Sequence, residues 1–199
     1  MKKIREIIIG TNNDGKYREI CDLLPKKIKK YSPKTYKILT PEETGKSFEE
    51  NSILKASYFS KKTNLICLSD DSGLEIDLLN GAPGIYSSRW GGSNKNFNEA
   101  IDKVFKEMSK IKKNWKDNIN AARFVCCLTI FWPDGRSFVS KGIVKGKIIN
   151  KKKGKKGFGY DPIFIPDGYN KTFGEMDSKL KWSIDHRSKA YFKIKNYFI

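Results

Sequence analysis

Residues 65–89 read LICLSDDSGLEIDLLNGAPGIYSSR, and the rest of the chain is organised around them. The apolar run at residues 65–68 is followed closely by two adjacent acids, Asp70 and Asp71. This pattern is typical of a buried strand whose C-terminal end delivers carboxylates to a cleft. Ser72 and Gly73 then predict a tight turn. A solvated turn also gathers acids, so this stretch alone leaves both interpretations open.

Length and composition predict one α/β domain over residues 1–199. With 38% hydrophobic residues the chain can bury a substantial core. The predicted strands cover residues 4–9, 36–39, 65–68, 122–132 and 138–149, and the predicted helices begin near residues 14, 48, 97 and 188. Because strands and helices alternate and the last two strands form a hairpin, we expect a mixed sheet.

The charge is strongly positive, with 40 Lys and Arg against 22 Asp and Glu, a formal net charge of +18. Such a balance favours polyanions, either nucleic acid or nucleotide phosphates. The alternative is a lysine-rich composition spread over solvated faces. The lysines lie in scattered runs, and lysine is poorly suited to bidentate recognition of bases. We therefore expect no specific nucleic-acid partner.

Cysteine and histidine usage argues against zinc and against a disulfide framework. The four cysteines form no C-x-x-C pair, and the chain has one histidine, His186. The apolar run near the N-terminus is too short for a signal peptide, and no run reaches membrane length. These observations predict a cytoplasmic protein with no membrane partner.

The segment GTNNDGK at residues 10–16 joins a predicted strand to a predicted helix. A helix N-terminus with nearby amides binds phosphate well, and Lys16 would add a charge. The spacing also fits the P-loop motif G-x-x-x-x-G-K, but Tyr17 stands where that motif needs Ser or Thr to hold magnesium. A plain strand-to-helix connection is the alternative.

Two further motifs each allow a functional and a structural interpretation. Ser47 and Glu50 fit a capping box, so Glu50 either caps a helix or acts as a metal ligand. Near residue 158, two glycines flank Phe158, and Tyr160 and Asp161 follow. These aromatic side chains suit either a planar base or the hydrophobic core.

Taken in order, these motifs resemble the non-canonical purine nucleoside triphosphate pyrophosphatases of the inosine triphosphatase (Ham1-like) family. The resemblance covers residues 11–190, and the block at residues 70–89 is its most specific part. The matching segments are TNNDGK (11–16), FEEN (48–51) with Lys55 and Ala56, DDSGL (70–74), NGAPGIYS (80–87), FGYDP (158–162) and IDHR (184–187). Two departures stand out: Asn12 replaces a common Gly, and Asp185 replaces the usual Ser.

The resemblance implies a hydrolase that cleaves between the α and β phosphates of ITP, dITP and XTP with Mg²⁺. It also implies an elongated mixed sheet with flanking helices that form two lobes around a central cleft, and a homodimer. Asp71 is then the proton acceptor and, with Glu50, a metal ligand. The implied substrate-binding residues are Thr11, Asn12, Asn13, Asp14, Gly15, Lys16, Lys55, Ser72, Phe158, Gly159, Tyr160, Asp161, Lys181, His186 and Arg187.

Among these, Thr11 to Lys16 with Lys55 and Ser72 are expected to bind the triphosphate. Phe158 is expected to stack on the base, while Lys181, His186 and Arg187 approach its edge. Two other functions stay open from the sequence, a P-loop-like phosphohydrolase that releases orthophosphate and a basic nucleic-acid-binding module that ignores magnesium.

Overall fold

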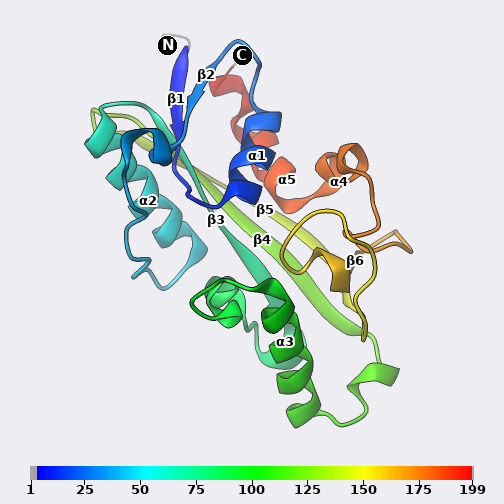
Figure 1. Ribbon diagram of the computed structural model, residues 1–199. Helices are drawn as coiled ribbons and strands as arrows, with labels where there is room; N and C mark the ends of the chain where they lie inside the picture. The colour runs from blue at the N-terminus through cyan, green and yellow to red at the C-terminus, as the bar shows by residue number, and fades with distance from the viewer. Residues whose placement is uncertain (1–3, 199) are drawn as a thin grey trace. The chain divides into compact units, whose positions relative to one another are not determined.

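The structure, a computed structural model, describes residues 4–198 of a mixed α/β protein (Figure 1). The strands are β1 (Glu6–Ile9), β2 (Lys29–Tyr31), β3 (Cys67–Ile76), β4 (Asn120–Phe131), β5 (Ser137–Ile148) and β6 (Phe164–Pro166). The helices are α1 (Asp14–Leu23), α2 (Phe48–Thr63), α3 (Phe97–Ile111), α4 (Ser178–Ile184) and α5 (His186–Ile194). Short 3₁₀ turns fill several of the connections.

The six strands form one sheet in the order β2-β1-β3-β4-β5-β6. β1 pairs in parallel with both β2 and β3, whereas β5 and β6 pair antiparallel. The sheet is therefore mixed, which confirms the predicted fold class. The predicted hairpin is also confirmed, since β4 and β5 are neighbours joined by a turn in which the Trp132 N–H bonds the Arg136 carbonyl at 2.9 Å.

Two compact units divide the chain. Unit 1 comprises described residues 4–71, 126–142 and 186–198, and unit 2 comprises residues 72–125 and 143–185. The boundary falls inside β3, β4 and β5, so each of these strands contributes residues to both units. The single domain expected over residues 1–199 stays a prediction.

In unit 1, alternate residues of β1 serve two separate hydrophobic clusters. Ile7 and Ile9 pack in a cluster with residues of α1 and α5, whereas Ile8 packs with Ala56 and Phe59 of α2. Successive strand residues point to opposite faces of a sheet, so α1 and α5 cover one face and α2 covers the other (Figure 1). This layering places polar residues of three helices beside the end of the unit 1 part of β3.

The tight turn predicted at Ser72 and Gly73 is wrong. β3 does not end at Asp70 but continues from Cys67 to Ile76, and nearly all its residues are buried. β1 pairs with Cys67 and Leu68 at the start of β3, and β4 is the neighbouring strand on the other side. Turn propensity is a weak local preference, and tertiary contacts override it here.

The predicted strand at residues 36–39 is also wrong. The edge strand is β2, and Pro33–Tyr36 forms a 3₁₀ turn with Pro33 in its first position and Ser32 as its cap. Lys37 then takes a left-handed conformation with φ of 54°. Proline fixes a φ suited to the start of a helical turn, which explains why the chain curls at this point.

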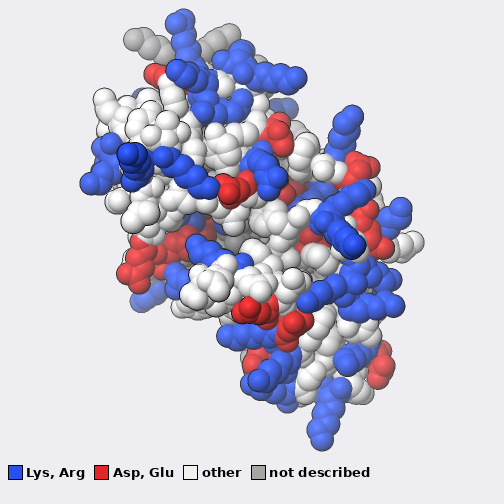
Figure 2. Space-filling view, in the orientation of Figure 1, with Lys and Arg blue, Asp and Glu red and all other residues white. Residues whose placement is uncertain are grey.

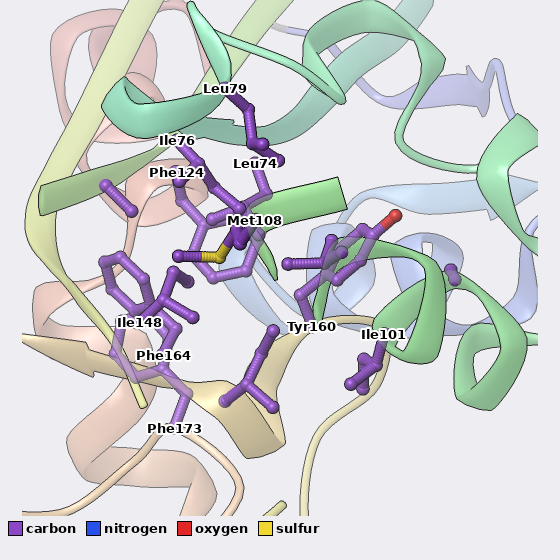
Figure 3. Close-up of a cluster of buried hydrophobic side chains, with 14 of the residues drawn as sticks. Leu74, Ile76, Leu79, Ile101, Met108, Phe124, Ile148, Tyr160, Phe164 and Phe173 are labelled. Carbon is purple, nitrogen blue, oxygen red and sulfur yellow. The ribbon is translucent and has the colours of Figure 1, made fainter. Parts of the chain in front are cut away.

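Unit 2 has its own core between α3 and the unit 2 parts of β3, β4 and β5. Figure 3 shows side chains from these elements, including Leu74, Met108, Phe124 and Ile148, meeting in this cluster. The helix predicted from Asn96 is confirmed, because the Asn96 side chain caps α3 by accepting from the Asn98 N–H at 3.0 Å.

Lys and Arg side chains lie scattered over the visible surface with acids among them (Figure 2). All four cysteines are free thiols: Cys67, Cys126 and Cys127 are buried and Cys21 on α1 is half-buried. Within residues 4–198, no helix is both long enough and apolar enough to span a bilayer.

Candidate functional site

The connection between β1 and α1 forms the N-terminal cap of the helix. The Asn13 side chain accepts from the Lys16 N–H at 3.0 Å, and the Thr11 hydroxyl accepts from the Asn13 N–H at 3.1 Å. The Asn12 amide donates to the Ile38 carbonyl at 3.2 Å, so the residue that departs from the family pattern is tied to a neighbouring loop. The predicted strand–turn–helix is confirmed, with its helix N-terminus close to Lys16.

Asp14, the first residue of α1, has a different environment from the rest of this turn. Its carboxylate is exposed and pairs with Lys34 at 2.6 Å. This contact holds the pKa of Asp14 below its ordinary value. A negative charge at the first turn also favours the helix dipole, so Asp14 has a structural role whether or not it meets substrate.

Asp71 is buried on the α2 face of unit 1. Its Oδ1 accepts from the Lys55 ammonium at 3.0 Å and its Oδ2 accepts from the Asn51 amide at 3.3 Å. Burial raises the pKa of Asp71, and the charges of Lys55 and Lys16 offset only part of that effect. A raised pKa brings a carboxylate closer to the range in which it accepts protons at neutral pH.

Glu43, which the sequence analysis missed, completes this side of the site. Its carboxylate contacts the Lys55 ammonium, so Lys55 lies between Glu43 and Asp71. Burial lowers the pKa of Lys55, but these nearby carboxylates outweigh it and hold the pKa above its ordinary value. Lys55 is therefore a permanently charged group beside Asp71.

Glu50 has the contacts of a capping residue. The Ser47 hydroxyl accepts from the Glu50 N–H at 3.1 Å, and the Glu50 carboxylate accepts from the Lys46 N–H at 2.8 Å. The predicted helix N-terminus at Ser47 is thereby confirmed. Glu50 is exposed, and a metal role for it stays a prediction.

Asp70 lies at the centre of a second charged cluster in unit 1. Its Oδ2 is 3.0 Å from the Arg187 guanidinium and 3.3 Å from the Lys16 ammonium. Arg187 also contacts the carboxylate of Glu19 on α1. Burial raises the pKa of Asp70, but Lys16, Arg187 and Lys55 outweigh it and hold this pKa well below the ordinary value.

His186 and Arg187 open α5 and are both buried in unit 1. Arg187 was expected at the base edge, and here its two terminal nitrogens contact Glu19 and Asp70. These partners lie 168 and 117 residues away in the sequence, which is why sequence reasoning missed Glu19.

The remaining predicted residues lie in unit 2, and three of them, Phe158, Asp161 and Lys181, form a compact group. The Asp161 carboxylate accepts from the Phe158 N–H at 2.9 Å and from the Lys181 ammonium at 2.7 Å. The Lys181 ammonium also lies 5.3 Å from the centre of the Phe158 ring. Gly157 has a φ of +72°, and a Cβ there would lie 2.0 Å from the Asp161 carboxylate, so this approach requires glycine.

Tyr160 is a core residue of unit 2. It is 2% exposed, packs in the hydrophobic cluster of Figure 3, and donates its hydroxyl to the Ser87 carbonyl at 2.8 Å. Burial raises the pKa of this phenol. Gly159 beside it has a φ of +69°, and its neighbour Phe158 is only half-buried. Of the two aromatic side chains, Phe158 is therefore the better candidate for stacking on a base.

The predicted site residues thus fall into two groups. Unit 1 holds Thr11, Asn12, Asn13, Asp14, Gly15, Lys16, Glu50, Lys55, Asp71, His186 and Arg187. Unit 2 holds Ser72, Phe158, Gly159, Tyr160, Asp161 and Lys181. Within residues 4–198, no three His, Cys, Asp or Glu side chains are grouped as a ready metal site.

Fold and site together define a mixed α/β protein that offers a helix N-terminus and ammonium groups for phosphate and a buried carboxylate for proton transfer. The Ham1 family model matches residues 7–197. The chain belongs to the Ham1 family.

Named relatives cover nearly the whole chain. A dITP/XTP pyrophosphatase of Rhodospirillum centenum is 42% identical over 189 residues, which are 94% of this chain and 92% of that protein. One of Bacillus cereus is 38% identical and covers 98% of this chain and 95% of its own. The solved structure of a HAM1 protein from Coxiella burnetii superposes with a TM-score of 0.85 at 34% identity, covering 97% of this chain and 98% of that one.

Proposed function

We propose that this protein hydrolyses non-canonical purine nucleoside triphosphates (ITP, dITP and XTP) to the monophosphate and pyrophosphate, and so removes them from the nucleotide pool. The observation that carries the proposal is the buried Asp71 carboxylate, held by Lys55 and Asn51, in a chain of the Ham1 family. The names of the relatives agree with this activity. Neither the P-loop-like phosphohydrolase nor the basic nucleic-acid-binding module is favoured by these comparisons.

The triphosphate binds at the N-terminus of α1 in this proposal. Asn13 already satisfies the Lys16 N–H, while the helix dipole and the Lys16 ammonium favour an anion in front of the helix. Lys55 is the second cation and Ser72 supplies a hydroxyl. The N–H groups of Thr11, Asn13 and Lys16 donate within the protein, so the amides proposed for phosphate are the others of this segment. Backbone amides suit phosphate because they donate without adding charge.

Asp71 orients the attacking water and accepts its proton. Lys55 donates to the carboxylate, and the raised pKa of Asp71 makes it a better proton acceptor than an exposed aspartate. Lys55 remains charged beside the proton that Asp71 receives. A hydrogen bond therefore joins the proposed base, Asp71, directly to a cation, Lys55.

Magnesium fits the chemistry of the available donors. Mg²⁺ prefers oxygen ligands and is usually bound by one or two carboxylates together with substrate phosphates. Asp71 provides such a carboxylate, and Glu50 in the first turn of α2 provides the second in this proposal. When bound, the ion would neutralise charge on the phosphates.

Phe158 stacks on the purine, and Lys181 donates to its 6-oxo group. Asp161 keeps Lys181 beside the ring by accepting from both the ammonium and the Phe158 N–H. Adenine carries an amino donor at that position and so offers the ammonium no acceptor there. Sites built around such hydrogen bonds discriminate by roughly 10⁴–10⁵. His186 and Arg187 are proposed to complete the base site.

From the family resemblance we also propose a two-lobed arrangement with a central cleft, a homodimer and a cytoplasmic location. Light scattering on the purified protein tests the dimer, for which twice the 22.9 kDa chain mass is expected.

The decisive assay is ITP with Mg²⁺ followed by identification of the products. Release of IMP and pyrophosphate supports the proposal. Release of orthophosphate indicates the phosphohydrolase, and inactivity combined with steeply salt-dependent binding of duplex DNA indicates the nucleic-acid module.

A further inference from the structure

We propose that Asn51 is a positioning residue for Asp71, which it aims by donating to one carboxylate oxygen. The inference rests on the proposed function, because it assigns Asp71 the role of base. Asn51 lies one turn before Lys55 on α2, and both side chains reach Asp71 from the same helix face. One oxygen of Asp71 accepts from the amide and the other from the ammonium, so the rotation of the carboxylate is fixed at both ends.

The orientation of the Asn51 amide is set by a second contact. Its Oδ1 accepts from the Gly45 N–H at 2.8 Å. An N–H bonds only to an acceptor, so the oxygen must face Gly45 and the NH₂ group must face Asp71. Asn51 is 0% exposed, and flipping the amide would bury two repulsive contacts at once.

Gly45 is close enough to make this contact because it has no side chain. A Cβ at this position would lie 2.6 Å from Asn51 Oδ1 and 2.8 Å from Glu50 Cβ. The same loop supplies Glu43 to Lys55. Each of the two α2 side chains that contact Asp71 is therefore held from behind by the segment 43–45.

Two substitutions separate positioning from folding. Asn51→Asp keeps the shape and the acceptor for Gly45 but turns a second carboxylate oxygen toward Asp71. Asn51→Ala removes both contacts. Loss of a residue that orients a functional carboxylate typically costs roughly 10–100-fold in activity, and we expect kcat on ITP to fall by about that factor in both variants.

The matched control is Ser52→Ala, the next residue of α2. Ser52 is also 0% exposed and bonds to Thr129 at 2.7 Å and to the Glu49 carbonyl at 2.8 Å, with no contact to Asp71. The thermal midpoint should fall in this variant, while kcat should stay within about 2-fold because only packing and stability change.

The inhibition constant for pyrophosphate distinguishes a positioning role from a structural one. A structural defect would change this constant and kcat together. Asn51 does not contact Lys16 or the turn before α1, so the inhibition constant should stay within about 3-fold while kcat falls. If Asn51→Ala is folded and keeps its kcat, or loses kcat and pyrophosphate affinity together, the inference is wrong. Failure of Asn51→Asp, Asn51→Ala and Asn51→Ser to fold would also count against it, since Asn51 would then serve the fold.

The wild-type protein is assayed first. Without pyrophosphate release from ITP by the wild type, it is the proposed function that fails. Once the wild type shows that activity, the Asn51 variants test the positioning role independently of the proposed function.

Discussion

Asp70 and Asp71 are adjacent in β3, yet their carboxylates serve opposite faces of the sheet. Asp70 contacts Arg187 of α5 and Lys16 of α1, whereas Asp71 contacts Lys55 of α2. Strand alternation requires this separation. As a result, the pKa of Asp70 lies below the ordinary value and that of Asp71 lies above it, although one peptide bond joins them.

Asp71→Asn should lower kcat on ITP by roughly 10²–10⁴-fold, the usual cost of losing a general base. The amide keeps the shape of the side chain but cannot accept the proton. Asp134→Asn, in the exposed turn after β4, is the control and should behave as the wild type. Near-normal turnover by Asp71→Asn in a product assay would remove Asp71 from the mechanism.

The activity should fall on the acid side at a pH above the ordinary aspartate range near 4. Burial raises the pKa of Asp71, so its carboxylate becomes protonated, and useless as a base, before an exposed aspartate would. Glu43→Gln removes a nearby negative charge that contributes to this raised pKa. The acid limb of kcat/KM should therefore move to lower pH in that variant, and a shift to higher pH would contradict the assignment.

Asp70→Asn should lower the free energy of unfolding by about 3–5 kcal/mol, because it breaks a buried ion pair and leaves cations uncompensated. Asp70 is 0% exposed. The contribution of Asp70 is present above the unfolded pKa of aspartate and is lost as pH falls through its depressed folded pKa, so the deficit of the variant should shrink in acid. Asp14→Asn breaks an exposed Asp–Lys pair and should change little, as urea unfolding of both variants will show.

Lys16→Ala should weaken ITP and pyrophosphate binding together, since both ligands share the polyphosphate that Lys16 is proposed to bind. Lys34→Ala removes the exposed partner of Asp14 and is the matched control. Competition experiments with pyrophosphate measure the effect directly. An unchanged inhibition constant in Lys16→Ala would place the phosphate site elsewhere.

Lys181→Ala should narrow the preference for ITP over ATP in kcat/KM. The ammonium is held by Asp161 beside Phe158, so its loss removes the donor proposed for the 6-oxo group. Lys179→Ala changes an exposed lysine on the same helix and should leave the ratio unchanged. Equal hydrolysis of ATP and ITP by the wild type would refute the base-reading role at the outset.

Local sequence signals predicted the elements that are built from local contacts. The caps at Asn13, Ser47 and Asn96 lie within three residues of the groups they satisfy, so each helix start was predictable. The β4–β5 hairpin likewise follows from alternation and a Pro-Asp-Gly turn.

Features that depend on contacts between residues far apart in the sequence were missed or wrongly predicted. Ser72 and Gly73 look like a turn, but β3, which has β4 as a neighbour in the sheet, continues through them. Asn51 entered the sequence analysis only as the last residue of the FEEN segment, because its contact with Asp71 spans 20 residues. Arg187 and Glu19 are 168 residues apart in the sequence, and no local sequence pattern predicts such an ion pair.

The cysteine distribution makes this protein convenient for site-selective labelling. Across residues 4–198, the thiols of Cys67, Cys126 and Cys127 are buried and Cys21 is half-buried, so a maleimide dye added to the native protein should attach at Cys21. Burial raises the pKa of the Cys21 thiol, so the coupling is best run at mildly alkaline pH. The dye would then sit on the same helix as Lys16 and could report nucleotide binding by fluorescence without any engineered cysteine.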